Sequence, residues 1–328
     1  MPPTLQGPQT RSQQTVETRW NRICDCKDEL LTHSQCNKMG IQITRLELET
    51  SPDSGRENRP VAGSYFEPLT DAFMSVHPID SQRLEKLLKR DPEFLVLRDY
   101  DSSAAIAEDR IKEFGQRYWG PKECLEEVVA VFEQHISRVP RLSREGFVGD
   151  CLTDLVDWSE VNHTVTLSQA YYLPSRKYLR DDMHPVKIMF EAVDYVYPHV
   201  TMVVQHNTKD IVNDDLILRH ELAYILHVMR TRLHEGLFAK KQPQPVLMVS
   251  FVAPQNGRIL EAYIEDQCRV KVACSRLYSF EHNSTAPFPL FYRWFLGRPI
   301  GIEPSKPRPR PHQIGSDMLC SGPTVGYR

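Results

Sequence analysis

The sequence predicts a single α/β or α+β domain in which one mixed sheet is flanked by helices, with disordered N- and C-terminal ends. Three observations lead to this fold class. Apolar residues in the central part of the chain recur at helical spacing in some stretches and in short β-branched runs in others. The two ends are polar or rich in proline. Hydrophobic residues make up 41% of the 328, which is enough for a sizeable core.

Composition divides the chain into three parts. Residues 1–60 are rich in Gln, Thr, Ser and Pro, and we expect most of them to form a disordered arm, because they bury too little apolar area to offset the entropy of ordering. Residues 61–300 are expected to form the single α/β domain. Residues 301–328 are proline-rich, which favours extended conformations, and they are expected to form a mobile tail.

Two helices are expected in the first half of the domain. "SQRLEKLLKR", residues 81–90, places three leucines on one face, and Asp80 before it can cap the exposed amides of the first turn. "PKECLEEVVAVFEQHI", residues 121–136, begins with proline, which is favoured at the first helical position, and then carries apolar residues at helical spacing.

The period of the apolar pattern then changes. Short β-branched or aromatic runs bounded by Pro, Asp and Asn predict three strands, at residues 163–173, 186–197 and 199–206. A further helix follows, with apolar positions from Leu216 to Met229 and with Gly236 as its stop.

Three more strands are expected after that helix, at residues 245–253, 257–266 and 268–280. The pair Asn256-Gly257 predicts a tight turn between the first two. The alternation in the second strand places Leu260, Ala262 and Ile264 on one face, which we expect to be the core-facing one. This order of helices and strands indicates an α/β or α+β domain around one sheet.

Charge and composition argue against several classes of function. The formal net charge is −3, so the chain gives no strong nucleic-acid signal and no global attraction to anionic membranes. Its start lacks the apolar core of a signal peptide, and no apolar run is long enough to span a bilayer. We therefore expect an intracellular protein, cytoplasmic or nuclear, with reduced cysteines. Phosphate-binding loops, dinucleotide-binding turns and nucleophile elbows are also missing from the sequence.

The stretch "RHELAYILHVMRTRLHEG", residues 219–236, begins like the zinc-binding helix of a metalloprotease but has a different spacing. That helix needs a second histidine four residues after the first, and Tyr224 stands there after His220. His220, His227 and His234 instead recur every seven residues, which separates neighbours by about 10 Å along the helix axis. We expect a histidine stripe at the edge of an amphipathic helix, with a pH-sensitive partner face as the alternative.

A second group of residues has the ligand types of a structural zinc site. Cys24, Cys26, His33 and Cys36 form the pattern C-x-C-x₆-H-x₂-C, although the first spacing is tighter than usual. Two interpretations follow: a zinc site, or reduced thiols in a disordered arm.

The order of elements over residues 121–280 resembles that of the metal-dependent PD-(D/E)XK nucleases. In that class an Asp on one strand and an acid-x-Lys on the next hold Mg²⁺ and the attacking water. The resemblance implies Asp194 for the first position and Asn207-Thr208-Lys209 for the second, where Asn207 replaces the acid. Glu191 or Asp210 would then have to supply the missing carboxylate. Under this alternative the catalytic residues are Glu191, Asp194 and Lys209, with Mg²⁺ as cofactor.

The C-terminal stretch "EPSKPRPRPHQ" contains Pro304-x-x-Pro307 beside Lys306 and two arginines. It is similar to the basic proline-rich peptides that bind aromatic-lined grooves of other proteins. This stretch is therefore the place where a protein partner is expected to bind. An inert tail is the other interpretation.

Finally, residues 213–280, with "NGRILEAY" and "SRLYSF", resemble a segment of uncharacterised proteins from filamentous fungi. That resemblance implies an accessory role in specialised metabolism.

Two hypotheses result. The first is an intracellular accessory or interaction protein without a conventional active site and with no predicted cofactor. The second is the divergent or inactive Mg²⁺-dependent nuclease, and whether the chain is an enzyme stays open. A cluster of Glu191, Asp194 and Asp210 beside Lys209 would favour the nuclease.

Overall fold

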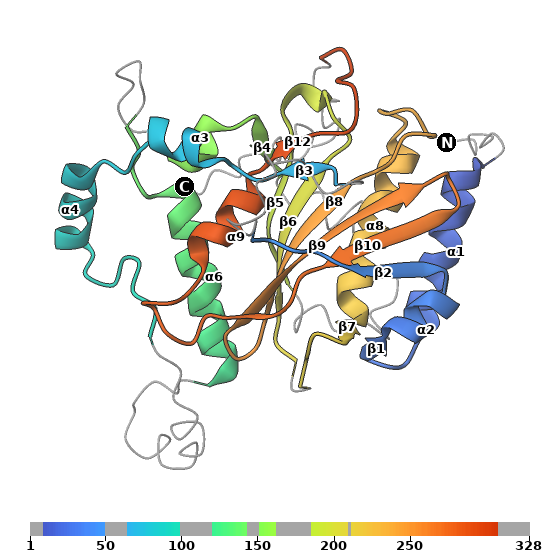
Figure 1. Ribbon diagram of the computed structural model, residues 1–328, viewed down its shortest axis with the longest axis horizontal. Coiled ribbons are helices and arrows are strands. Elements are labelled where there is room, and N and C mark those ends of the chain that lie inside the picture. Colours follow the sequence, from blue (N-terminus) through green and yellow to red (C-terminus); the bar gives the residue numbers. More distant parts are fainter. Residues whose placement is uncertain are drawn as a thin grey trace, which may run out of the picture.

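The computed structural model describes residues 9–49, 64–98, 120–142, 151–161, 185–208 and 211–307. At its centre is a mixed sheet of eight strands with helices on both faces (Figure 1), which confirms the predicted fold class. In spatial order the strands are β2 (Ile41–Arg45), β10 (Arg269–Cys274), β9 (Asn256–Glu265), β8 (Val246–Val252), β6 (Val200–His206), β5 (Val186–Ala192) and β4 (Trp158–Glu160), and β11 (Tyr278–Ser279) pairs with β9.

Two pairs of strands in this sheet are parallel, β2 with β10 and β6 with β8, and the other pairs are antiparallel. In the second parallel pair Val200 lies opposite Val246 and His206 opposite Val252, so the two strands end at the same edge of the sheet. All residues of β6 and β8 are buried, as expected for central strands covered on both faces.

In the described part of the chain, helices cover both faces of the sheet. α1 (Arg11–Asp25) and α8 (Arg219–Glu235) lie on one side, which we call the α8 face, and α6 (Pro121–Ser137) and α9 (Phe288–Phe295) lie on the other, the α6 face (Figure 1). Alternate residues of β6 serve the two cores: Met202 packs on the α8 face, and Val203 packs on the α6 face.

Shorter elements complete the described chain. They are the helices α2 (His33–Lys38), α3 (Asp71–Val76) and α4 (Ser81–Arg90), the 3₁₀ turns η3 (Leu152–Leu155) and η4 (Val193–Tyr195), and two small sheets, β1 (Leu30–Thr32) with β7 (Leu216–Leu218) and β3 (Phe66–Glu67) with β12 (Arg298–Pro299). The helices predicted over 81–90 and from Pro121 are confirmed, and Asp80 caps the first of them through the amide of Arg83.

The prediction of a disordered arm over 1–60 is wrong for residues 9–49, which belong to the folded domain. In α1 the residues Val16, Trp20 and Ile23 are spaced along one face and are buried against α8. The helix starts with a capping box, because Thr10 and Gln13 each accept a hydrogen bond from the other's backbone amide. Residues 1–8 and 50–63 lie outside the described part of the chain.

Three predicted boundaries also need correction. The helix expected from Leu216 starts at Arg219, because Leu216–Leu218 form β7 and pair with β1. The strand expected over 186–197 ends at Ala192 and continues as the turn η4. The run 268–280 forms two strands, β10 and β11, rather than one. The strand predicted over 163–173 lies outside the described residues.

The turn between β8 and β9 is formed by Ala253–Gln255, and Asn256-Gly257 already belongs to β9. Gly257 is required for another reason. A Cβ atom at this position would lie 2.9 Å from ring carbons of both Phe251 and Phe280, and 3.1 Å from one of Phe291. The glycine therefore serves close packing against aromatic rings on the α6 face rather than the predicted turn.

Candidate functional site

The residues implied by the nuclease resemblance lie in different surroundings. Glu191 on β5 is buried, and its carboxylate is 3.2 Å from a guanidinium nitrogen of Arg232 on α8. Asp194 is exposed in η4, where its backbone is left-handed. Lys209 and Asp210 lie outside the described residues. In the described ranges no three or more His, Cys, Asp or Glu side chains are grouped so as to hold a metal ion.

The four residues of the expected zinc pattern are likewise not gathered into a metal site within the described chain. Cys24 lies on α1 and Cys36 on α2, and all described cysteines are free. Burial raises the pKa of the Cys24 thiol to about 11 and that of Cys36 to about 12. Since zinc binds the thiolate, these surroundings disfavour the ligand form.

The histidine stripe of α8 does not lie at the edge of the helix as predicted. His220 and His227 are buried, and only His234 is exposed. The ring of His227 packs 5.0 Å from that of Trp20 on α1, measured between ring centroids. The reason is that α1 covers α8 from outside, so α8 is buried between a helix and the sheet.

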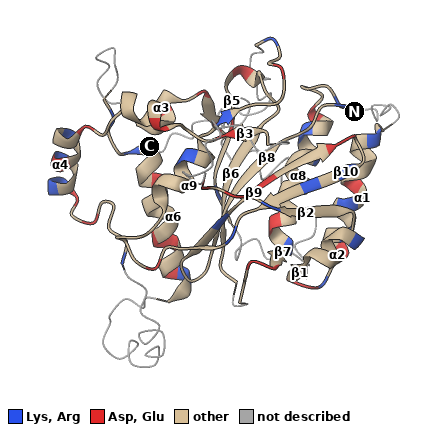
Figure 2. Cartoon of the chain, in the orientation of Figure 1, with Lys and Arg blue, Asp and Glu red and all other residues tan. Residues whose placement is uncertain are grey.

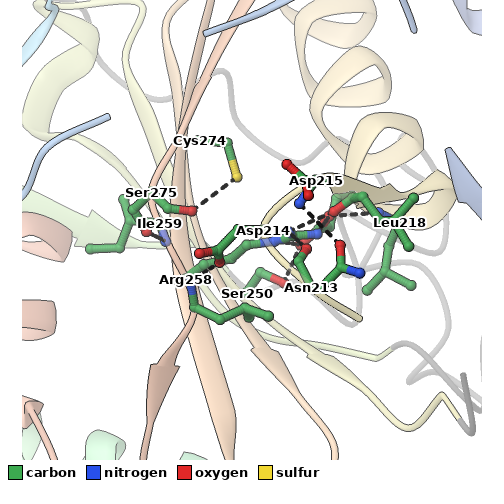
Figure 3. Close-up of polar contacts among 12 residues, drawn as sticks. Asn213, Asp214, Asp215, Leu218, Ser250, Arg258, Ile259, Cys274 and Ser275 are labelled. Atoms are coloured by element: carbon green, nitrogen blue, oxygen red, sulfur yellow. Dashed lines mark hydrogen bonds and ion pairs between the residues drawn. The ribbon is translucent and has the colours of Figure 1, made fainter. Parts of the chain in front are cut away.

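A buried ion pair fixes the start of α8 on the sheet (Figure 3). Arg258 on β9 donates two hydrogen bonds to the carboxylate of Glu221, at 2.8 and 2.6 Å, and both side chains are fully buried. The same carboxylate accepts from the hydroxyl of Ser250 and from the backbone amide of Leu218. Burial alone would lower the pKa of Arg258, but Glu221 outweighs it, and the net shift is upward. Four donors therefore satisfy one carboxylate.

A second buried carboxylate, Glu261 on β9, lies on the α6 face without a paired cation among the described residues. It accepts hydrogen bonds from the Ser64 hydroxyl and the Tyr65 backbone amide, and so holds the segment before β3 on the sheet. Burial raises the pKa of Glu261 to about 7, although the two hydrogen bonds lower it. Close by, Nε2 of His199 lies 3.0 Å from the carbonyl oxygen of Tyr65 and 3.2 Å from that of Ile300.

A cavity of about 570 Å³ opens at the edge of the sheet where the parallel strands β6 and β8 end. Its lining is mostly apolar and includes Val212, Val252, Ala253 and Leu277. Ile211 also lines it and is 87% exposed, which places an apolar side chain at its mouth. The volume lies in the range of sites for small organic molecules, which are typically apolar with a few placed polar groups.

The polar lining includes Lys122 and Asn207. Asn207 directly follows β6, is 6% exposed, and its Oδ1 accepts a hydrogen bond of 2.7 Å from Nε2 of Gln205. Lys122 belongs to the first turn of α6 and is exposed, with Nζ 3.8 Å from a carboxylate oxygen of Glu126. Thr208 and Asn256 also line the cavity, which thus has an apolar body and a small number of polar groups.

The buried ion pair of Arg258 and Glu221 also positions one wall of the cavity. A third guanidinium nitrogen of Arg258 donates to the backbone oxygens of Asn213 and Leu216, and so fixes the segment that follows Val212 (Figure 3). Beside it, Asp214 accepts a hydrogen bond of 2.7 Å from the backbone amide of Leu277. This hydrogen bond therefore connects the loop after β6 to the segment after β10 at the cavity.

No motif in the sequence marks this cavity, although one signal for it is present. The predicted strand 199–206, the helix after it and the strand 245–253 form a strand-helix-strand unit. If the two strands are parallel, their carboxyl ends meet at one edge, which is where ligands bind in such sheets. The residues at that edge carry no motif, so residue patterns alone did not single them out.

Comparisons of the chain with protein-family models, curated proteins and solved structures gave no significant match. In the described ranges, none of the helices has both the length and the apolar character that crossing a bilayer requires. Of the proline-rich stretch, Pro304, Lys306 and Pro307 are exposed, and residues 308–328 lie outside the description. The protein partner expected there stays a prediction.

Proposed function

We propose that the chain is an accessory binding protein, without a conventional active site, that holds a mainly apolar small molecule in the cavity at the ends of β6 and β8. The observation that carries this proposal is the cavity itself, with its volume of about 570 Å³ and its largely apolar lining. Its place at the carboxyl ends of two parallel strands supports the proposal, because ligands of open α/β sheets bind there.

The exposed Ile211 gives further support. A side chain of this size gains little from water contact, and covering it by a ligand at the cavity mouth would contribute about 1.5–3 kcal/mol if burial were complete. Isolated exposed apolar residues are common on proteins, but this one borders a cavity with the same chemical character.

The resemblance to proteins of filamentous fungi is part of the proposal. The resembling segment, residues 213–280, contributes Val252, Ala253 and Leu277 to the cavity wall. On this basis we propose an intracellular accessory role in specialised metabolism, in which the chain binds a small molecule without transforming it.

The nuclease alternative receives less support. Glu191 is engaged by Arg232, and a carboxylate in such a pair is a poor candidate for holding Mg²⁺. In the described part of the chain, the exposed Asp194 belongs to no group of three or more His, Cys, Asp or Glu side chains that could hold a metal ion.

The proposal can be tested by calorimetric titration of the full chain with a neutral bicyclic probe, 1-naphthalenemethanol. Binding is expected in the wild type, and Val212→Trp should abolish it by filling the cavity. The matched control is Val193→Trp, since Val193 is partly exposed in η4, at the opposite edge of the sheet, and this variant should bind like the wild type. No binding by the wild type, or equal loss in both variants, would contradict the proposal.

A further inference from the structure

We infer that the ligand of the cavity carries a carboxylate group, which Lys122 and Asn207 bind while the apolar body fills the remaining space. This inference rests on the proposed function and adds the chemical class of the ligand. It depends on the identity and placement of the polar groups that line the cavity.

Asn207 supplies the first part of the argument. Its side chain is more than nine-tenths buried and lines the cavity. Because Oδ1 already accepts from Gln205, the Nδ2 amino group is the part of the amide left for a ligand, and this group can only donate. An amide donor that lines a mainly apolar cavity is best satisfied by an acceptor, and most strongly by a charged one.

Lys122 supplies the second part. It lies in the first turn of α6, a helix of 17 residues whose N-terminal end carries a partial positive charge. Its ammonium group is 3.8 Å from Glu126, a long and exposed contact that leaves it able to reorient toward a ligand. Pro121 and Lys122 both line the cavity, so the positive end of α6 and the lysine charge act at the same place.

Charged side chains of both signs stand near the cavity, because Glu123 and Glu126 flank Lys122 on α6. Among the described lining residues Lys122 is the charged one, and no carboxylate lines the cavity with it. Elsewhere, basic and acidic residues are interspersed on the same helix, as on α4 (Figure 2). With a net charge of −3 the chain has no global positive field, so a preference for anions must come from the site.

The test compares three probes of the same shape by calorimetric titration of the full chain at pH 7.5. They are 1-naphthoate, which is an anion, 1-naphthalenemethanol, which is neutral, and 1-naphthylmethylammonium, which is a cation. We expect the carboxylate to bind about tenfold tighter than the alcohol and the cation to bind most weakly. Because Lys122 is exposed, the advantage of the carboxylate should shrink as salt is added.

Two variants assign the preference to the named residues. Lys122→Gln removes the charge, and Asn207→Asp replaces the donor by an oxygen while keeping an acceptor for Gln205. Each should lose the preference for 1-naphthoate, measured in that variant as the ratio of the dissociation constants of the alcohol and the carboxylate. The matched control is Lys89→Gln on α4, which removes another exposed lysine with a glutamate partner on the same helix and should leave the preference unchanged.

The outcomes separate this inference from the proposed function. If all three probes bind equally well, the cavity binds apolar molecules but the carboxylate inference is wrong. If none binds, both are wrong. If the wild-type preference persists in both Lys122→Gln and Asn207→Asp, the carboxylate binds elsewhere and the inference is overturned.

Discussion

The two faces of the central sheet are stabilised in different ways. On the α8 face, charged side chains are buried and paired: Arg258 with Glu221, and Arg232 with Glu191. On the α6 face the core is aromatic, with Phe251, Phe280 and Phe291 packed at ring-centroid distances of 5.0–6.0 Å. Directed hydrogen bonds therefore add to the apolar packing that holds α8, whereas α6 and α9 are held by packing with a large aromatic share.

This difference explains where the cavity lies. On the α8 face, Arg258 of the buried ion pair holds the loop after β6, which forms one wall of the cavity. The first turn of α6 forms the opposite wall. The cavity is the space between a wall held by hydrogen bonds and the first turn of α6. Substitutions on each face should accordingly have different effects, which the following predictions test.

The largest effect is expected for Glu221. Glu221→Leu leaves the guanidinium of Arg258 buried and unpaired, and should lower the free energy of unfolding by about 3–5 kcal/mol. The double variant Glu221→Leu, Arg258→Met removes both charges and should regain most of this loss. Urea unfolding measures both, with Glu126→Gln as a control that should change stability by less than about 1 kcal/mol. A double variant no more stable than the single one would contradict the account of the α8 face.

Glu261 is the exception on the aromatic face and should make stability depend on pH. Burial raises its pKa in the folded state to about 7, from an ordinary value of 4.5. Between pH 4.5 and pH 7 the folded protein therefore holds a proton on Glu261 that the unfolded chain has lost. The stabilising contribution is complete below pH 4.5 and is lost as the pH rises through 7. The loss amounts to at most about 3 kcal/mol.

The variant Glu261→Gln should remove this dependence, since its amide oxygen still accepts from the Tyr65 amide. Thermal unfolding at pH 5 and pH 8 measures the effect as the difference between variant and wild type. The melting temperature of the variant, relative to that of the wild type, should be higher at pH 8 than at pH 5. An identical difference at both pH values would show that Glu261 does not titrate in this range.

A somewhat smaller effect is expected at Gly257. The methyl group of Gly257→Ala would lie 2.9 Å from the rings of Phe251 and Phe280, and such overpacking costs about 1–3 kcal/mol. The cost should be lower in a Phe280→Leu background, where the smaller side chain leaves room. A double-mutant cycle in urea measures the coupling, and additive effects would argue against tight ring packing at this position.

The smallest effect concerns the outer layer of the α8 face. Thr10→Ala removes the side-chain cap of α1 and should cost about 1 kcal/mol. Thr18→Ala, an exposed position in the middle of the same helix, serves as the control and should be neutral or slightly stabilising. Equal losses in the two variants would contradict a specific role for the cap.

Local signals in the sequence predicted some elements well. Asp80 and Pro121 mark the starts of α4 and α6, because capping and first-turn preferences act over a few residues. A capping signal is also present at Thr10 and Gln13. The polar composition of residues 1–60 nevertheless favoured disorder, although Val16, Trp20 and Ile23 are spaced along one face of a helix. Composition averaged over a long stretch is a poor guide where a few apolar side chains and hydrogen bonds such as that from Gln13 to the Leu233 carbonyl dock a helix.

The cavity could not be predicted in the same way. Lys122, Asn207, Val252 and Leu277 are far apart in the sequence, and only the parallel pairing of β6 with β8 and the docking of α6 bring them together. Likewise, the pairing of Glu191 with Arg232 depends on the last turn of α8 lying near the end of β5, which no local pattern contains. Long-range packing therefore decides both the site and the role of the expected nuclease carboxylate.

The central claim, that the cavity binds a mainly apolar molecule, is tested most directly by methyl NMR of the full chain during titration with 1-naphthalenemethanol. The methyl signals of Val212, Val252 and Ala253 should shift with one common dissociation constant. Those of Val16 and Val272, in the core of the α8 face, should stay in place. Unchanged signals from the three cavity residues at saturating probe, or larger shifts at Val16 and Val272, would contradict the account.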